Sequence, residues 1–238
     1  MTKPLVVVTG ASHGIGRSTA AKFAVEGHPI LLVARHPEPL DGVPAKQVRQ
    51  ASVDVADYAA LESAIREAEA VFGPTECLVN NAGLLKIGPL GARNVAEMSY
   101  EVDVLFKGVL NGIRIVLAGM KARRSGTIIN VSSIGDRTAG PNGEVYHASK
   151  AAVRSLSASL QKGEAANNVR VINIAPGFVK TSIHVDMGIS FEAYCEQLGN
   201  PDFISADELA DIILFCWKQP QRLCIRDIAV MPTTSSFA

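Results

Sequence analysis

Tyr146 and Lys150 stand four positions apart in "VYHASKAA" (145–152), at the start of an alanine-rich run. If this run is helical, the two side chains are neighbours on one face of the helix. A free tyrosine titrates near pH 10, too high for a proton donor or acceptor working near neutrality. An ammonium group about 4 Å away contributes up to ~4 kcal/mol and could lower the phenol pKa by roughly one to three units. Burial opposes this effect, so we expect the net lowering to be the smaller figure or less.

The elements that would position this pair follow from alternating apolar runs and helix patterns. Seven short runs predict strands, at 5–9, 30–34, about 47–53, 77–82, 127–133, 169–177 and 224–232. Helix patterns lie between most of them, at 15–26, 57–72, 99–122, 146–165 and 206–217. Several strands are apolar throughout, as in parallel sheets covered on both faces. This order predicts an α/β fold with one doubly wound, Rossmann-type parallel sheet and right-handed crossovers.

One connection departs from the helical pattern. Residues 36–46, "HPEPLDGVPAK", contain three prolines and a glycine. Proline inside a helix removes a hydrogen bond and clashes with the preceding turn, so we expect the second crossover to be a loop. No repeat or linker divides the chain, and a single domain over residues 1–238 is the simplest prediction.

A glycine-rich turn, "TGASHGIG" (9–16), joins the first predicted strand to the first helix. Gly10, Gly14 and Gly16 let the backbone turn tightly and approach a ligand. The helix N-terminus then offers free N–H groups and a positive dipole end to a pyrophosphate. The spacing is GxxxGxG rather than the usual GxGxxG, and a plain tight turn is the alternative interpretation.

The end of the second strand predicts which dinucleotide binds. The sequence there is Ala34-Arg35-His36, without the acidic residue that accepts hydrogen bonds from the ribose hydroxyls of NAD. Arg35 can instead form a bidentate contact with a 2′-phosphate, and His13 in the glycine-rich turn could add a second donor. The preference is therefore NADP(H), unless Arg35 is only a solvated surface residue.

Composition excludes several other classes of function. Charged residues make up 19% of the chain and the net charge is zero, so neither nucleic acid nor a membrane surface is expected as a partner. No apolar run approaches the roughly 18–20 residues of a membrane span, and the first ten residues predict a strand rather than a signal peptide. The chain has four cysteines, Cys77, Cys195, Cys216 and Cys224, without CxxC spacing or the spacing of a metal site. This pattern predicts buried free thiols, no bound metal and a cytoplasmic protein.

Six motifs in this order resemble the short-chain dehydrogenase/reductase family, from about residue 4 to the C-terminus. They are TGASHGIG (9–16), Asp54-Val55, NNAG (80–83), Ser133 placed 13 residues before a tyrosine, YxxxK (146–150) and PGFVKT (176–181). The resemblance implies that Ser133, Tyr146 and Lys150 are catalytic. Ser133 would bond the substrate carbonyl, Tyr146 would deliver the proton, and Lys150 would also hold the nicotinamide ribose while NADPH supplies hydride.

The same resemblance assigns the contacts with the cofactor. Asp54 and Val55 would flank the adenine, and Asn81 would line the nicotinamide side. Val179 and Thr181 would hold the carboxamide. The complete expected set is Gly10, Ser12, His13, Gly14, Ile15, Gly16, Arg35, Asp54, Val55, Asn81, Ala82, Gly83, Tyr146, Lys150, Pro176, Gly177, Val179 and Thr181.

The chain departs from the family pattern at Leu105. Family members commonly carry an asparagine 28 residues before the serine and 24 after the second Asn of NNAG, and both counts reach Leu105. That asparagine helps seat a water that links the lysine to solvent, and Asn111 lies over one and a half turns away. Two hypotheses follow: proton resupply runs through backbone and water alone, or the chain binds NADP(H) as a regulator or sensor with vestigial catalysis.

The favoured prediction is an NADPH-dependent carbonyl reductase or alcohol dehydrogenase acting on a small ketone, aldehyde or hydroxy compound. An NAD-linked alcohol dehydrogenase is a further alternative. A segment at about 182–204 follows the sixth strand and is expected to form a substrate lid, with plain packing of a short helix as the other interpretation. The C-terminal sequence from 226 resembles the branch acting on hydroxy acids, amino-acid alcohols and small ketones or aldehydes. Family resemblance also implies a homodimer or homotetramer.

Overall fold

The computed structural model describes residues 3–234, except for the side chains of Asp186 and Gln197. Seven parallel strands form one sheet in the order β3-β2-β1-β4-β5-β6-β9. Their bounds are β1 Leu5–Thr9, β2 Ile30–Ala34, β3 Val48–Ser52, β4 Thr75–Asn80, β5 Thr127–Val131, β6 Arg170–Pro176 and β9 Asp227–Val230. The predicted doubly wound α/β fold is confirmed, with strand order reversing beside β1.

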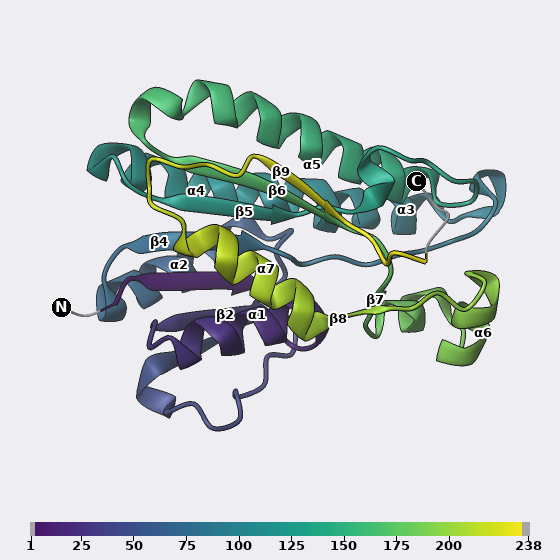
Figure 1. Cartoon of the computed structure of the whole chain (residues 1–238), viewed down its shortest axis with the longest axis horizontal. Coiled ribbons are helices and arrows are strands. Elements are labelled where there is room, and N and C mark those ends of the chain that lie inside the picture. Colours follow the sequence, from purple (N-terminus) through teal and green to yellow (C-terminus); the bar gives the residue numbers. More distant parts are fainter. Residues whose placement is uncertain (1–2, 235–238) are drawn as a thin grey trace.

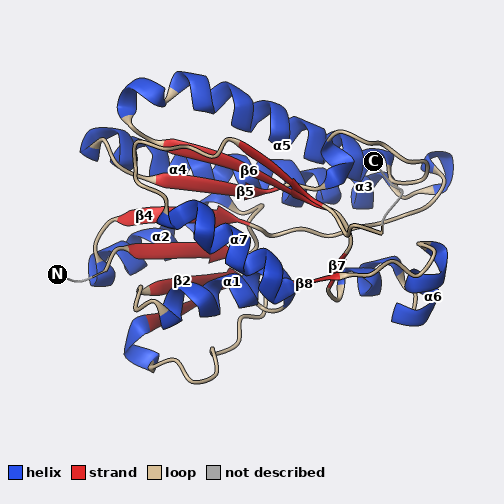
Figure 2. Ribbon diagram, viewed as in Figure 1, coloured by secondary structure: helices blue, strands red, loops and turns tan. Residues whose placement is uncertain are grey.

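Helices cover both faces of this sheet (Figures 1 and 2). One face carries α1 (Gly14–Val25) and α7 (Ala206–Lys218), which pack against each other. The opposite face carries α2 (Tyr58–Phe72), α4 (Gly108–Arg123) and α5 (Glu144–Gly163). In Figure 1, α7 crosses the near face of the sheet and α4 lies behind it.

Alternation along β1 explains why its sequence is apolar throughout. Leu5 and Val7 belong to the core beneath α2, α4 and α5, whereas Val6 and Val8 belong to the core beneath α1 and α7. Successive side chains of a strand point to opposite faces, so a strand covered on both sides must be apolar at every position. All five residues of β1 are buried.

The predicted helix at 99–122 is two α-helices separated by a distorted turn. Helix α3 (Val95–Val102) begins at 95 because the Asn94 carboxamide oxygen caps it, accepting hydrogen bonds from the N–H groups of Ala96 and Glu97. A π-helical turn over Asp103–Lys107 then leads into α4. The prediction of one regular helix was therefore wrong at its start and in its middle.

The second crossover has no α-helix, as its prolines predict. The chain passes from β2 to β3 through a loop that ends in a short 3-10 turn, Ala45–Gln47. Arg17 of α1 holds this loop, because its guanidinium donates to the Pro39 carbonyl at 2.9 Å and contacts Asp41 at 3.1 Å.

A smaller unit lies beyond the carboxyl ends of the strands (Figure 1). It contains β7 (Val179–Lys180), a 3-10 segment (Ile183–Met187), α6 (Phe191–Gln197) and β8 (Ile204–Ser205), with β7 and β8 paired. Aromatic rings join its parts: those of Phe191 and Tyr194 lie 5.4 and 6.1 Å from that of Phe203. The segment that is expected to act as a lid therefore folds as a small unit of its own.

Among residues 3–234, no helix combines the length and apolarity needed to cross a membrane. All four cysteines are free thiols; Cys77 and Cys216 are buried, whereas Cys195 is half-buried and Cys224 is exposed. The prediction of buried thiols was therefore wrong for Cys195, which lies in α6, and for Cys224, which precedes the edge strand β9.

Candidate active site

A cavity of about 650 Å³ runs along the carboxyl ends of the central strands. Parallel strands end at the same edge of their sheet, so segments far apart in sequence meet there. Of the predicted site residues, all but Gly16 line this cavity. Gly16 has a structural position instead, because a Cβ there would come within 2.5 Å of the Asn81 Nδ2 atom.

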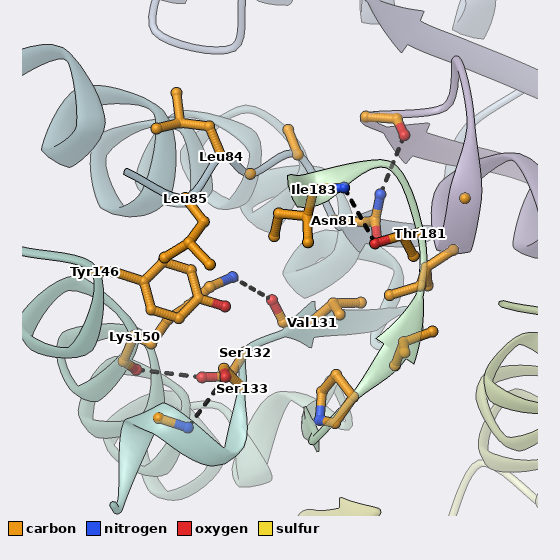
Figure 3. Close-up of a pocket in the computed structure, with 18 of the residues that line it drawn as sticks. Asn81, Leu84, Leu85, Val131, Ser132, Ser133, Tyr146, Lys150, Thr181 and Ile183 are labelled. Carbon is orange, nitrogen blue, oxygen red and sulfur yellow. Dashed lines mark hydrogen bonds between the residues drawn. The ribbon is translucent and has the colours of Figure 1, made fainter. Parts of the chain in front are cut away.

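Ser133, Tyr146 and Lys150 lie together at one end of the cavity (Figure 3). Ser133 follows β5, and Tyr146 and Lys150 lie in the first two turns of α5. The Lys150 Nζ atom is 5.7 Å from the centre of the Tyr146 ring and donates a hydrogen bond to the Val131 carbonyl at 2.9 Å. The predicted proximity of tyrosine and lysine is confirmed, with the ammonium over the ring.

The electrostatic expectation for this pair was wrong in sign. Burial is the largest influence on the Tyr146 pKa and raises it to about 12, while a hydrogen bond from Ser133 acts in the opposite direction. Burial also lowers the pKa of Lys150 to about 8. Removal from water disfavours the charged forms of both groups.

The turn after Ser133 is built to hold its hydroxyl group in place. The Ser133 oxygen accepts a hydrogen bond from the Gly135 N–H at 3.0 Å. His147, next to Tyr146, shares its Nδ1 proton with the Gly135 carbonyl at 3.2 Å. A Cβ on Gly135 would come within 2.5 Å of that nitrogen, so only glycine leaves room for the imidazole. This turn therefore links Ser133 to the helix that carries the tyrosine.

The glycine-rich turn occupies the middle of the cavity. The Asn81 side chain donates to the carbonyls of Thr9 and Gly10, at 3.0 and 3.2 Å, and fixes the turn against the end of β4. Gly10 and Gly14 adopt positive φ angles of 66° and 55°. His13 is the N-cap residue of α1 but makes no side-chain cap, and the first turn of α1 holds no acidic residue. The N–H groups of this helix start are therefore open to an anion.

Arg35 and Asp54 lie at the far end of the cavity, beside Tyr100. The Tyr100 hydroxyl donates to Asp54 at 2.6 Å, and Asp54 also accepts from the Ala56 N–H at 2.9 Å. Burial and Asp54 raise the pKa of Tyr100, while the exposed guanidinium of Arg35 acts on it in the opposite direction. The sequence did not single out Tyr100, which lies in a helix pattern and carries no motif.

Val55 lines this end of the cavity, and Asn111 of α4 holds it in place. The Asn111 amide donates to the Val55 carbonyl at 2.9 Å. Asn111 is thus occupied in holding the 55–56 turn, and the conclusion that it does not replace the family's asparagine is consistent with this contact. Val55 in turn packs on α4, where a Cβ on Gly108 would lie 2.6 Å from its Cγ2 atom.

Leu105 lies in the π-helical turn and is fully buried. Its Cδ2 atom lies 3.4 Å from the point that a Cβ on Gly83 would occupy, and the Lys150 Nζ atom lies 3.9 Å from the same point. Leu105 therefore places an apolar side chain near Gly83 and Lys150 without lining the cavity itself. A π-turn is a frequent feature of functional sites.

The segment 177–182 lies against the glycine-rich turn. The Ser182 hydroxyl and the His13 Nδ1 atom are 3.1 Å apart. A Cβ on Gly14 would lie 3.2 Å from the Thr181 Cγ2 atom. The Gly177 N–H donates to the Val230 carbonyl at 2.7 Å and anchors the same segment to the edge strand. Residues from 176 to 182 therefore close one side of the cavity.

The fold and the site define a class of nucleotide-binding oxidoreductase. The family model described as "short chain dehydrogenase" matches residues 4–188 of this chain. An uncharacterised oxidoreductase of Listeria monocytogenes is 31% identical, over 98% of this chain and 98% of its own. The NADP-dependent 3-hydroxy acid dehydrogenase of Salmonella typhi is 31% identical, over 98% of this chain and 97% of its own. The closed form of serine dehydrogenase complexed with NADP+ is 29% identical, with a TM-score of 0.91, over 98% of this chain and 97% of that one.

This chain belongs to the short-chain dehydrogenase family, and it is an oxidoreductase of that family. The match covers the glycine-rich turn, the NNAG segment and the Ser–Tyr–Lys group. The resemblance that the sequence motifs predict is therefore confirmed.

Proposed function

We propose that this protein is an NADPH-dependent carbonyl reductase, which in the reverse direction oxidises the corresponding alcohol. The observation that carries the proposal is the Ser133–Tyr146–Lys150 group at one end of a cavity whose other end holds Arg35. The names of two relatives support it, an NADP-dependent 3-hydroxy acid dehydrogenase and a serine dehydrogenase complexed with NADP+.

The residues present fit a bound dinucleotide phosphate. The open N–H groups at the start of α1 would receive the pyrophosphate, and Arg35 would receive the 2′-phosphate. Glycine at 14 keeps this passage open, because a side chain there would approach Thr181 within 3.2 Å. Asn81, Val179 and Thr181 would hold the nicotinamide end. When bound, the reduced nicotinamide supplies the hydride.

Tyr146 acts in this proposal as the proton donor to the carbonyl oxygen. Its pKa of about 12 keeps the phenol protonated at neutral pH, which suits reduction better than oxidation. Ser133, which acts on the phenol and lines the same end of the cavity, would donate to the same carbonyl oxygen. Lys150 remains mostly protonated at pH 7, since its pKa is about 8, and it stabilises the phenolate that forms.

Leucine at position 105 leaves Ser133, Tyr146 and Lys150 in place. A leucine cannot bond a water molecule, so proton resupply to Lys150 would use backbone carbonyls of the π-helical turn and solvent. The sensor alternative, which Leu105 motivated, has no observation that favours it: Ser133, Tyr146 and Lys150 converge on one cavity.

The test measures NADPH oxidation with a panel of small ketones and aldehydes, using the decrease in nicotinamide absorbance as the readout. We expect turnover with several carbonyl compounds and a lower KM for NADPH than for NADH. Tight NADPH binding without turnover on any compound would contradict the reductase proposal and favour the sensor. A lower KM for NADH would favour the NAD-linked alternative.

Three expectations about the whole protein stay proposals. We expect one domain over the chain, a homodimer or homotetramer in solution, and a cytoplasmic location. Light scattering of the purified protein measures the second directly, and a monomeric mass at micromolar concentration would contradict it.

A further inference from the structure

The cavity wall around Tyr146 is mostly apolar. Six residues from three separate segments form it: Leu84, Leu85, Ile134, Phe178, Ile183 and Tyr194. Figure 3 shows Leu85 and Ile183 on the cavity side of Tyr146. Leu84 and Tyr194 are only 8% and 9% exposed, so this wall is closely packed. A ligand group in contact with it would lose most of its hydration.

Two of the three permanent charges that line the cavity lie away from this wall, and the third, Lys150, lies beside the Tyr146 ring. Among the lining residues they are Arg35, Asp54 and Lys150. Arg35 follows β2 and Ser133 follows β5, three strand positions apart, which corresponds to about 14 Å at ~4.8 Å per strand. The Lys150 amine lies over the tyrosine ring and donates to the Val131 carbonyl. Among the lining residues, the permanent cation near this wall is Lys150, whose amine already bonds Val131, and the neighbouring His147 imidazole is held by the Gly135 carbonyl.

Two carboxylates that do not line the cavity act on the Tyr146 phenol, and each is paired with an arginine. The side chains of Glu101 and Asp136 are fully buried, and each is paired with an arginine that does not line the cavity, at 2.6 Å in both cases. Both carboxylates raise the pKa of Tyr146, so the field at the phenol opposes added negative charge. The Lys180 amine, at the end of β7, lies 5.4 Å from the Phe191 ring centre, and Lys180 is not among the lining residues.

We infer that the substrate of this protein is an uncharged, largely apolar carbonyl compound, and that keto acids and phosphorylated carbonyl compounds are excluded. The inference rests on the proposed reductase function and deepens it. It separates this chain from the two relatives named for 3-hydroxy acids and for serine, compounds that carry a carboxylate. Buried ions require a partner of opposite charge, and the wall supplies none.

Matched pairs of substrates test the inference, each a 3-oxo acid and its ethyl ester, for example acetoacetate and ethyl acetoacetate. Reduction consumes one NADPH and one proton and forms the 3-hydroxy compound, with hydride on the carbonyl carbon. We expect kcat/KM to be at least about 100-fold higher for the ester. Equal or better reduction of the acids would overturn the inference and leave the reductase proposal standing. Silence on every pair and on the neutral panel would overturn both.

A charge placed in the wall provides the second arm. In Leu85→Lys, the ester-to-acid ratio of kcat/KM should fall by about tenfold or more, because the new ammonium pairs with the carboxylate. Leu85→Gln is the matched control, polar and of similar length but uncharged, and it should leave the ratio within about threefold of the wild type. NADPH affinity and the unfolding midpoint verify that both variants fold. A folded Leu85→Lys with an unchanged ratio would contradict contact between this wall and the substrate, and would overturn the inference.

Discussion

Burial, rather than charge pairing, dominates the chemistry of Tyr146 and Lys150. The YxxxK spacing correctly predicts that the two side chains are neighbours, because i and i+4 residues share a helix face. It cannot predict that the Lys150 amine bonds to the Val131 carbonyl, a contact set by the packing of α5 on β5. The sequence therefore predicts the partners but not the sign of the pKa change.

The buried lysine predicts a stability that depends on pH. The pKa of Lys150 is about 8 in the folded protein against 10.5 in its unperturbed state, so burial of the charge costs about 3 kcal/mol below pH 8. This penalty disappears as the pH rises from 8 to 10.5, because the unfolded chain binds more protons over that range. We expect Lys150→Met to be more stable than the wild type at pH 7, with a difference that shrinks towards pH 10 in urea unfolding. A difference independent of pH would contradict the lowered pKa.

Arg35 predicts the cofactor preference. A charge-assisted hydrogen bond contributes about 1.5–3 kcal/mol, so Arg35→Asp should raise the KM for NADPH by roughly 10- to 100-fold. NADH lacks the 2′-phosphate and serves as the internal control, with a KM that should change little or fall. Steady-state kinetics with both coenzymes measure this. Parallel losses for NADPH and NADH would mean that Arg35 does not contact the 2′-phosphate.

Among the elements, regular strands and helices could be predicted from the sequence, whereas irregular turns could not. The apolar runs and the glycine-rich turn are local patterns, so β1, α1 and the proline-rich crossover were predictable. The π-helical turn Asp103–Lys107 carries no local signal. The chain at Gly108 passes so close to Val55 that only the tertiary structure reveals the constraint.

That close approach makes Gly108 testable. An added Cβ would lie 2.6 Å from Val55 Cγ2, so Gly108→Ala should destabilise the protein by about 1–3 kcal/mol and weaken NADPH binding through the displaced 55–56 turn. Gly119→Ala, in the same helix, is the control. Its Cβ would meet only the end of the Arg123 side chain, and alanine favours the helix by up to about 1 kcal/mol. Equal stability of both variants would contradict the constraint at Gly108.

If residues 182–204 act as a substrate lid, a change within them should weaken substrate binding without weakening NADPH binding. Phe203 contacts the rings of Phe178, Phe191 and Tyr194 at 5.4 to 6.4 Å between centroids. Phe203→Ala should loosen this cluster and raise the KM for the carbonyl substrate about tenfold, with the Kd for NADPH unchanged. Kinetics and fluorescence titration distinguish the two. A comparable loss of NADPH affinity would show that the segment supports the cofactor end instead.

For the whole molecule, the site is a consequence of the parallel sheet. Residues from 9 to 181 meet because β1, β4, β5 and β6 are adjacent and end at one edge. That topology was predictable, and with it the convergence of the six motifs. The substrate wall was predictable only in part: the segment that carries Ile183 and Tyr194 was expected over a partly apolar substrate, whereas Leu84 and Leu85 lie in a loop without a motif, whose position depends on packing.

The most direct test of the account is the turnover of Tyr146→Phe, measured as carbonyl-dependent NADPH oxidation together with the Kd for NADPH. Loss of a positioned proton donor should lower kcat by about 10²–10⁴-fold. The Kd should stay within about twofold, because only one hydroxyl group is removed. Tyr58→Phe, which removes a hydroxyl that bonds Glu62 outside the cavity, should retain full activity. A Tyr146→Phe variant that turns over at the wild-type rate would contradict the proposed role of this tyrosine and the mechanism built on it.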